Sequence, residues 1–106
     1  MLDHSLDEVF HALSDASRRR MVERLVRSPA SVSDLAKPLD MTLAAVVQHV
    51  QVLEACGVVK TEKLGRTRMC RVEPKALTTA GKWIQERRDL WEHRFDLLEK
   101  ELRKNK

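Results

Sequence analysis

The feature that most constrains this chain is a helix of low charge that the sequence predicts over residues 41–57. In a chain in which 34% of the residues are charged, this segment carries a single charge, at Glu54. Helices that face solvent seldom have so few charges, so the flanking segments must explain what its outer face does. The helix is predicted from a capping threonine, apolar residues at helical spacing and a closing glycine: Thr42, Val46, Val47, Val50, Leu53 and Gly57.

A second, shorter helix is predicted immediately upstream. Ser33 can cap it, and it is expected to end near Pro38, because a proline disfavours helical geometry in the residue before it. Only a few residues of turn then remain before Thr42. The pattern predicts a helix-turn-helix at about residues 33–56.

A β-hairpin is predicted downstream. Two strand-like runs cover residues 58–63 and 67–72, and Gly65 between them suits the positive φ that a tight hairpin turn needs. A hairpin after a helix-turn-helix is a wing, here at about residues 58–72. The predicted fold class is therefore mainly α, a winged helix-turn-helix with a two-stranded β-hairpin wing.

Three segments carry a resemblance to a known family: LSDASRRRMVERL, SVSDLAKPLDMTLAAVVQHVQVLEACGVV and GRTRMCRVEP. They resemble the ArsR-type family of bacterial winged-helix repressors over nearly the whole chain. The resemblance implies a transcriptional regulator that represses by blocking a promoter. Two departures matter, because the family usually has Ser where Val47 stands and often Lys or His where Gln48 stands.

Positive charge is concentrated on the predicted wing. Between Lys60 and Lys75, six cations stand against two carboxylates, an excess equal to the net charge of +4 of the whole chain. Cations supply contacts to DNA phosphates, whereas uncharged donors and acceptors on an inserted helix distinguish base pairs. We therefore predict binding to double-stranded DNA. The predicted base-reading residues are Thr42, Ala45, Gln48, His49 and Gln51, and the predicted backbone contacts on the wing are Lys63, Arg66 and Arg68.

Several of these positions keep an alternative. His49 falls between Val46 and Val50 and is equally well explained as a partly buried core histidine. Gln48 is the stronger candidate for a bidentate hydrogen bond with adenine, and Val47 belongs either to the core or against a thymine methyl group. Near the N-terminus, Arg24 and Arg27 are interpreted as part of a solvated helix face. For Arg18 and Arg19, contact of one of them with a DNA phosphate is left open.

Two further helices are predicted at the N-terminus. The first is expected to begin at a capping box, residues 5–8, and to run to about Leu13, and the second to be capped by Ser14 or Asp15 and to end at residues 28–29. In the second helix the residues predicted to face inward are Met21, Val22, Leu25 and Val26, and those predicted to face outward are Arg18, Arg19, Arg20, Arg24 and Arg27.

A long C-terminal helix is predicted at about residues 75–103, with a brief interruption near Thr78, Thr79 and Gly81. Apolar residues then repeat at intervals of seven, which is typical of a seam for another helix. About 26 helical residues extend roughly 39 Å, more than one small domain can cover, so we predict a homodimer that reads two half-sites of an inverted repeat. The predicted dimer interface comprises Leu6, Phe10, Trp83, Leu90, Trp91, Phe95, Leu98 and Leu102.

Metal sensing of the resembling family's usual kinds is not expected. Those sensors use cysteines on the first helix of the helix-turn-helix, or Asp and His pairs on the C-terminal helix. Here the first segment has no thiol, and Asp89 and His93 lie one turn apart without a second histidine after them. A site across the dimer from His4 or His11 with His93 is the remaining arrangement, and we predict neither metal nor cofactor.

The two cysteines are too few for a disulfide framework, which agrees with a reducing compartment. Cys56 beside Gly57 suits a small packed thiol, whereas Cys70 alternates along a strand and faces either the domain or solvent. A reactive Cys70 would place a thiol switch on the wing.

At 106 residues the chain is expected to form a single domain, residues 1–106, without a membrane span and in the cytoplasm. It has no phosphate loop, nucleophile elbow or evident carboxylate pair, so no enzyme is predicted. The leading interpretation is a DNA-binding repressor. The alternatives are a thiol- or metal-responsive sensor repressor and a winged helix that binds protein.

Overall fold

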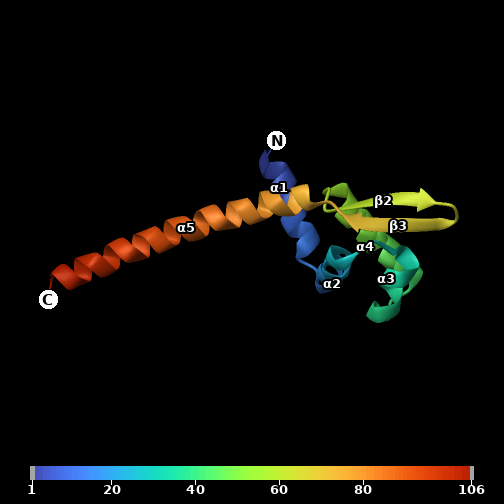
Figure 1. Cartoon of the computed structure of the whole chain (residues 1–106), viewed down its shortest axis with the longest axis horizontal. Coiled ribbons are helices and arrows are strands. Elements are labelled where there is room, and N and C mark those ends of the chain that lie inside the picture. Colours follow the sequence, from blue (N-terminus) through green and yellow to red (C-terminus); the bar gives the residue numbers. More distant parts are fainter. Residues whose placement is uncertain (1, 106) are drawn as a thin grey trace.

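The computed structural model describes the backbone of residues 2–105 and the side chains of residues 6–105. Four helices and a small sheet form a body at one end of a much longer helix, and the molecule measures 70 × 31 × 20 Å (Figure 1). The helices are α1 (Leu2–Leu13), α2 (Ala16–Arg27), α3 (Val32–Leu39), α4 (Leu43–Ala55) and α5 (Pro74–Lys104), and the strands are β1 (Ala30–Ser31), β2 (Val59–Leu64) and β3 (Thr67–Val72).

The helix-turn-helix consists of α3 and α4. The N-cap of α3 is Ser31, whose hydroxyl accepts from the Asp34 N–H at 3.0 Å, so the prediction that Ser33 caps this helix was wrong. Ser31 takes this role because it ends a strand, and its extended backbone leaves the first helical N–H groups facing its side chain. The helix ends at Asp40 in a left-handed conformation with φ of 50°, and Thr42 caps α4 as predicted.

The sheet is three-stranded and antiparallel, in the order β1-β3-β2. The wing hairpin was predicted, but β1 was not, because a two-residue strand carries no detectable alternation. The hairpin turns through Gly65 and Arg66, and Gly65 has φ of +64° at the first loop position, as in a type II′ turn. Leu64 pairs with Thr67 and therefore belongs to the strand rather than to the turn.

The core lies between α1, α2, α3, α4 and the base of the wing. Val26 does not belong to it: its side chain is 64% exposed, although the sequence pattern predicts an inward orientation. Met21, Val22 and Leu25 already fill the buried face of α2, and Val26 lies beyond its edge. The largest fully buried side chains are Met21, Leu35, Leu53, Val9, Val46, Val58, Val59 and Cys70.

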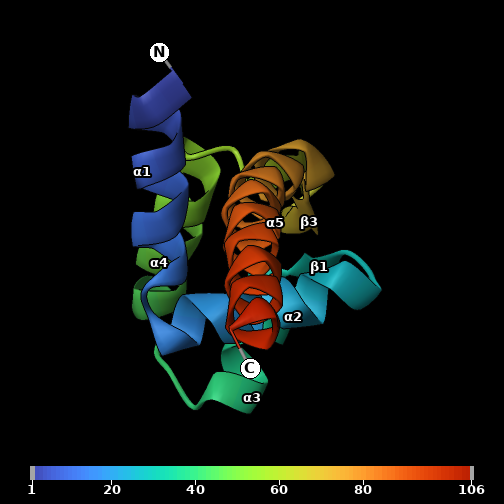
Figure 2. The same ribbon diagram turned by 90° about the vertical axis from the view of Figure 1, so that its left-hand side faces the viewer.

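The terminal helices differ from the prediction in the start of α1 and in the continuity of α5, whose bounds agree with the prediction to within one residue. The first, α1, starts at Leu2, so residue 5 lies inside the helix and is not its N-cap. The predicted interruption of α5 was wrong: the helix is continuous, and the hydroxyls of Thr78 and Thr79 donate to the carbonyls four residues earlier, at 2.9 and 3.1 Å, within it. In Figure 1, α1 crosses the first part of α5, and Figure 2 looks along α5 with α1 to its left; the two helices are in contact.

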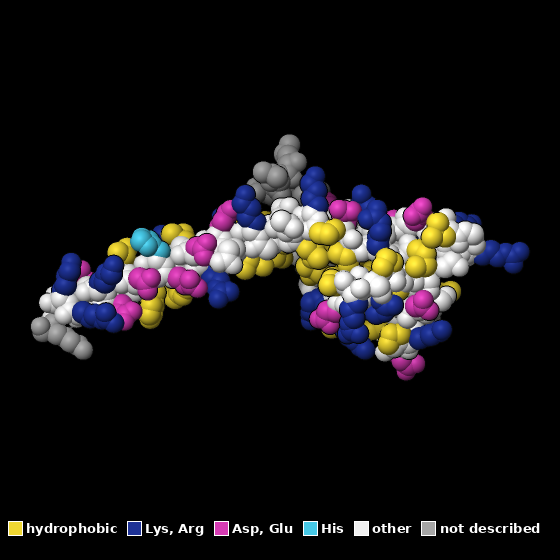
Figure 3. Space-filling view, in the orientation of Figure 1, with side chains coloured by type: hydrophobic (Ala, Val, Ile, Leu, Met, Phe, Trp, Pro, Cys, Tyr) yellow, Lys and Arg dark blue, Asp and Glu magenta, His cyan; other side chains and the backbone are white. Residues whose placement is uncertain are grey.

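Most of α5 projects beyond the body formed by the other helices and the sheet (Figure 1). Ala80 is its one buried residue, and every side chain from Gly81 to Asn105 is exposed. The space-filling view shows yellow apolar side chains along the projecting part, interspersed with charged ones (Figure 3). Within the described residues, no helix combines the length and apolar character that crossing a bilayer requires.

Candidate nucleic-acid interface

The outer face of α4 is a stripe of uncharged side chains. Val46, Val50 and Leu53 turn inward and are at most 4% exposed, which leaves the opposite side of the helix uncovered. Leu43 is 53% exposed and Val47 is 38% exposed. The outer stripe of α4 comprises Leu43, Ala44, Val47, Gln48 and Gln51.

The structure separates the five predicted base-reading residues into two groups. Gln48 and Gln51 are exposed on the outer stripe, and Thr42 is exposed at the start of the helix, where its Oγ1 accepts from the Ala45 N–H at 3.1 Å. Ala45 and His49 are half-buried and do not belong to the outer stripe. Sequence spacing does bring Gln48 and Gln51 together, but it does not place His49 beside them.

His49 is held by a contact with Arg18 of α2. Its Nδ1 lies 3.2 Å from Arg18 Nη1 and 3.9 Å from Asp15 Oδ2. A guanidinium has donors only, so Arg18 is the donor in a hydrogen bond with this ring nitrogen. The backbone N–H of Arg18, bonded to Asp15 at 3.0 Å, lowers the pKa of that carboxyl.

The Arg18 guanidinium also donates hydrogen bonds to backbone carbonyls near the C-terminal end of α1. Its Nε donates to the Ala12 carbonyl at 2.7 Å and its Nη2 to the His11 carbonyl at 3.3 Å. These bonds engage the group within the body, although the sequence left phosphate contact open for it. Arg19 makes a similar bond, from Nη1 to the Leu13 carbonyl at 2.8 Å, but has no contact with α4 among those the structure gives.

Sequence reasoning missed Leu43 and Ala44 and left Val47 undecided. All three are apolar, and an apolar residue in a helix is ordinarily assigned to the core. Their positions around the helix could have revealed them. Val46, Val50 and Leu53 already form a complete buried face, and Leu43, Ala44 and Val47 lie outside it.

The cations of the wing fall into two groups, one paired with a carboxylate and one without an ion pair among the described residues. On one face of the hairpin, near its base, Lys60 and Arg71 both pair with Glu73, at 3.6 and 3.4 Å. On the other face, Lys63 and Arg68 are directly opposite each other in the ladder, and the ion pairs of the described residues include neither. Two like charges in that position repel, so this face is suited to an anion.

A groove lies between the wing and α4. Two hollows of about 310 Å³ each share Val32, Val47 and Arg68 in their walls. At its inner end Arg68 Nη1 donates to Thr61 Oγ1 at 2.9 Å, and Thr61 donates to Glu54 Oε2 at 2.6 Å, which ties both strands of the wing to α4. Arg66 lines the outer end, at the tip of the hairpin.

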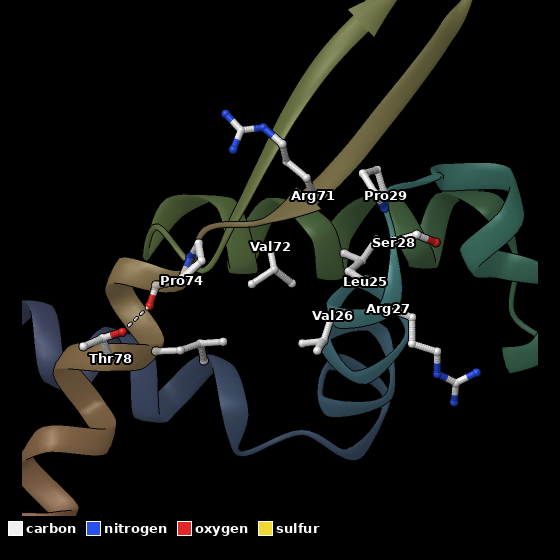
Figure 4. Close-up of a pocket in the computed structure, with 10 residues that line it drawn as sticks. Leu25, Val26, Arg27, Ser28, Pro29, Arg71, Val72, Pro74 and Thr78 are labelled. Carbon is white, nitrogen blue, oxygen red and sulfur yellow. Dashed lines mark hydrogen bonds between the residues drawn. The ribbon is translucent and has the colours of Figure 1, made fainter.

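A larger pocket, of about 700 Å³, lies where α2, β3 and the start of α5 meet (Figure 4). Its walls are mainly apolar, from Val26, Val72 and Leu77, with Arg27 and Arg71 at the edge. It contains none of the predicted base-reading residues.

The predicted dimer interface divides between the body and the projecting helix. Phe10 of α1 and Trp83 of α5 pack edge to face within the chain, with ring centroids 5.8 Å apart, and Arg87 lies 4.6 Å from the centre of the Trp83 ring. Leu6 is half-buried against the core. The other predicted interface residues are exposed by 52–68%: Leu90, Trp91, Phe95, Leu98 and Leu102.

The described histidines and thiols do not gather into a metal site, although His11 and Cys56 line one pocket. No group of three His, Cys, Asp or Glu side chains suited to a metal occurs in the described part of the chain, where His11 and His93 are both exposed. The side chain of His4 lies outside the described residues. Cys70 is fully buried and faces the body, and half-buried Cys56 bonds through Sγ to the Leu53 carbonyl at 3.3 Å.

The helix-turn-helix domain family matches residues 13–62 of this chain. The chain is 37% identical over 73 residues to the HTH-type transcriptional regulator Rv2034 of Mycobacterium tuberculosis, covering 69% of this chain and 68% of that protein. It is 36% identical over 59 residues to the transcriptional repressor SmtB homolog of Synechocystis sp., covering 56% of this chain and 45% of that protein.

The fold also matches a solved structure, that of the ArsR family transcriptional regulator RHA00566. The two chains superpose with a TM-score of 0.79 at 42% identity, over 85% of this chain and 93% of the other. With this match added to the helix-turn-helix, the hairpin wing and the long terminal helix, the chain belongs to the ArsR family of winged helix-turn-helix transcriptional regulators.

Proposed function

We propose that the chain is a homodimeric repressor that binds an inverted-repeat DNA operator in the cytoplasm. The observation that carries this proposal is the pairing of two surfaces beside one groove. One is the uncharged outer stripe of α4, and the other is the wing face that carries Lys63 and Arg68, where the Glu54 carboxylate in the groove wall accepts a hydrogen bond from Thr61. A base-reading helix needs the first surface, and binding to the phosphate backbone needs the second.

In this proposal α4 enters the major groove with its outer stripe facing the bases. Gln48 and Gln51 meet base edges there, while Lys63, Arg66 and Arg68 neutralise phosphates along the groove between helix and wing. His49 has a different role, because its contact with Arg18 orients α4 rather than reading a base. Ala45 is half-buried and is likewise left out of the reading surface.

The homodimer is supported by the projecting half of α5. A row of apolar side chains at helical spacing, each more than half exposed, is costly in water unless another helix covers it. A second copy supplies an identical row, and two-fold symmetry then presents two α4 helices to one face of the DNA. Within the described part of the chain, these side chains remain more than half exposed.

The experiment that tests the function is selection of bound sequences from random duplex DNA, followed by affinity measurements across a salt series. We expect an inverted repeat with half-site centres about 34 Å apart, and an affinity that falls steeply with salt. Failure to enrich any sequence, alone and with zinc or an oxidant present, would contradict the proposal and favour a winged helix that binds protein.

A further inference from the structure

The recognition helix offers no cation to the DNA bases. Between Lys37 and Lys60 the sequence contains no lysine and no arginine, so α4 and both of its flanking turns lack them. The outer stripe consists of two amides, Gln48 and Gln51, and apolar side chains. The cations closest to the stripe along the groove, Arg66 and Arg68, belong to the wing.

The four bases differ in the chemistry that reads them in the major groove. Guanine presents two acceptors, N7 and O6, which are most often bound by arginine or lysine. Adenine presents an acceptor and a donor, N7 and N6, which match the two ends of a glutamine amide, and thymine presents its C5-methyl group to apolar side chains. The outer stripe therefore has partners for adenine and thymine and lacks the usual partner for guanine.

Resting on the DNA-binding function proposed above, we infer that each α4 reads a core of A·T pairs. Val47 packs against a thymine methyl, and Gln48 forms two hydrogen bonds with an adenine. Val47 is exposed by 38% and Leu43, one turn earlier, by 53%, so both present part of their methyl surface to solvent in the groove. The wing cations beside the same groove supply the charge that phosphate requires.

The test removes single methyl groups from the DNA. In the selected duplex, each thymine is replaced in turn by deoxyuridine, which keeps the base-pairing groups and lacks only the C5-methyl. We expect at least one replacement per half-site to weaken binding by about fourfold, the loss that corresponds to one buried methyl-sized group. Binding is measured by fluorescence anisotropy at constant salt.

The protein side of the same contact is tested with Val47→Ala. This variant should bind the thymine duplex several-fold more weakly than the parent protein and should no longer distinguish thymine from deoxyuridine at the affected position. Val26→Ala is the matched control, because Val26 is an exposed valine on α2, outside the proposed DNA surface. It should retain the full thymine preference.

A gain-of-function variant tests Gln48. Gln48→Arg should move the preference at one position of each half-site from adenine to guanine, because arginine is the usual partner of guanine N7 and O6.

The outcomes separate this inference from the function on which it rests. A selected operator with a G·C core, or equal weakening of thymine and deoxyuridine duplexes by Val47→Ala, would overturn the A·T inference and leave the repressor proposal standing. An enriched operator is required for the proposed function itself, and its absence would remove both.

Discussion

Arg18 shows how one side chain joins three helices. It bonds to the last carbonyls of α1, begins α2 beside its cap Asp15, and contacts His49 on α4. The relative positions of these helices therefore depend on a guanidinium that the sequence places in an ordinary run of arginines.

We expect Arg18→Gln to lower the free energy of unfolding by about 1–3 kcal/mol, because it removes the guanidinium donor of the partly buried Ala12 carbonyl and the contact with His49. Arg19→Gln is the matched control, since Arg19 bonds to one exposed carbonyl of α1 and does not reach α4. Its loss should stay within about 0.5 kcal/mol in the same urea titration. Equal losses in the two variants would show that the bridge to α4 contributes nothing.

Cys70 provides a prediction about pH. Burial raises the pKa of its thiol above the ordinary value of 9.0, and the Glu54 carboxylate adds to that shift. The folded state thus keeps the proton to a higher pH than the unfolded state, so the resulting stability is complete below pH 9.0 and is lost as pH rises toward the folded-state pKa.

Cys70→Ala should therefore lose less stability than the parent protein between about pH 7.5 and about pH 9.5, as measured by urea unfolding at both values. Cys56→Ala keeps the buried thiol and should retain the parent's dependence on pH. An unchanged alkaline loss in Cys70→Ala would assign that loss to other groups.

Among the elements, the wing gives the most direct test of DNA contact. Lys63 and Lys60 lie three residues apart on opposite faces of β2, and among the described residues Lys60 has a carboxylate partner, Glu73, whereas Lys63 has none. Lys63→Gln should reduce the slope of log affinity against log salt by about 1, the effect of one lost phosphate contact. Lys60→Gln should leave the slope unchanged. A smaller slope in Lys60→Gln alone would place the phosphate on the other face.

The elements also show what the sequence can and cannot predict. The hairpin and the cap of α4 follow from local chemistry, since Gly65 and Thr42 each define a turn or a helix start by themselves. In contrast, β1 exists because Ala30 pairs with Cys70, forty residues away. Pairing over such a distance leaves no local pattern to read.

The same distinction applies to the candidate site. Gln48 and Gln51 are exposed as helical spacing predicts, whereas the position of His49 depends on Arg18, which arrives from another helix. The outward orientation of Leu43 and Val47 depends on which side of α4 the body covers. Composition alone cannot supply that information, because the same residues would suit a core equally well.

For the whole molecule, the exposed half of α5 predicts an assembly that one substitution can dissociate. Trp91→Glu places a charge in the apolar row and should shift the protein to monomer in sedimentation, with operator affinity reduced to that of a single half-site. His93→Glu is the control, because it lies about 200° around the helix from Trp91 and points away from the row. A Trp91→Glu dimer of unchanged strength would refute this interface.

The junction between β3 and α5 has a mechanical consequence for the whole molecule. Only Glu73 separates them, and it is clamped: its N–H donates to the Val58 carbonyl at 2.8 Å and its carboxylate holds Lys60 and Arg71. A 31-residue helix is about 46 Å long, so α5 can act as a lever whose short end is the wing. In the proposed dimer, a ligand that changed the crossing angle of the two α5 helices by a few degrees would tilt both wings. Such a ligand would regulate DNA binding from a site far from the DNA.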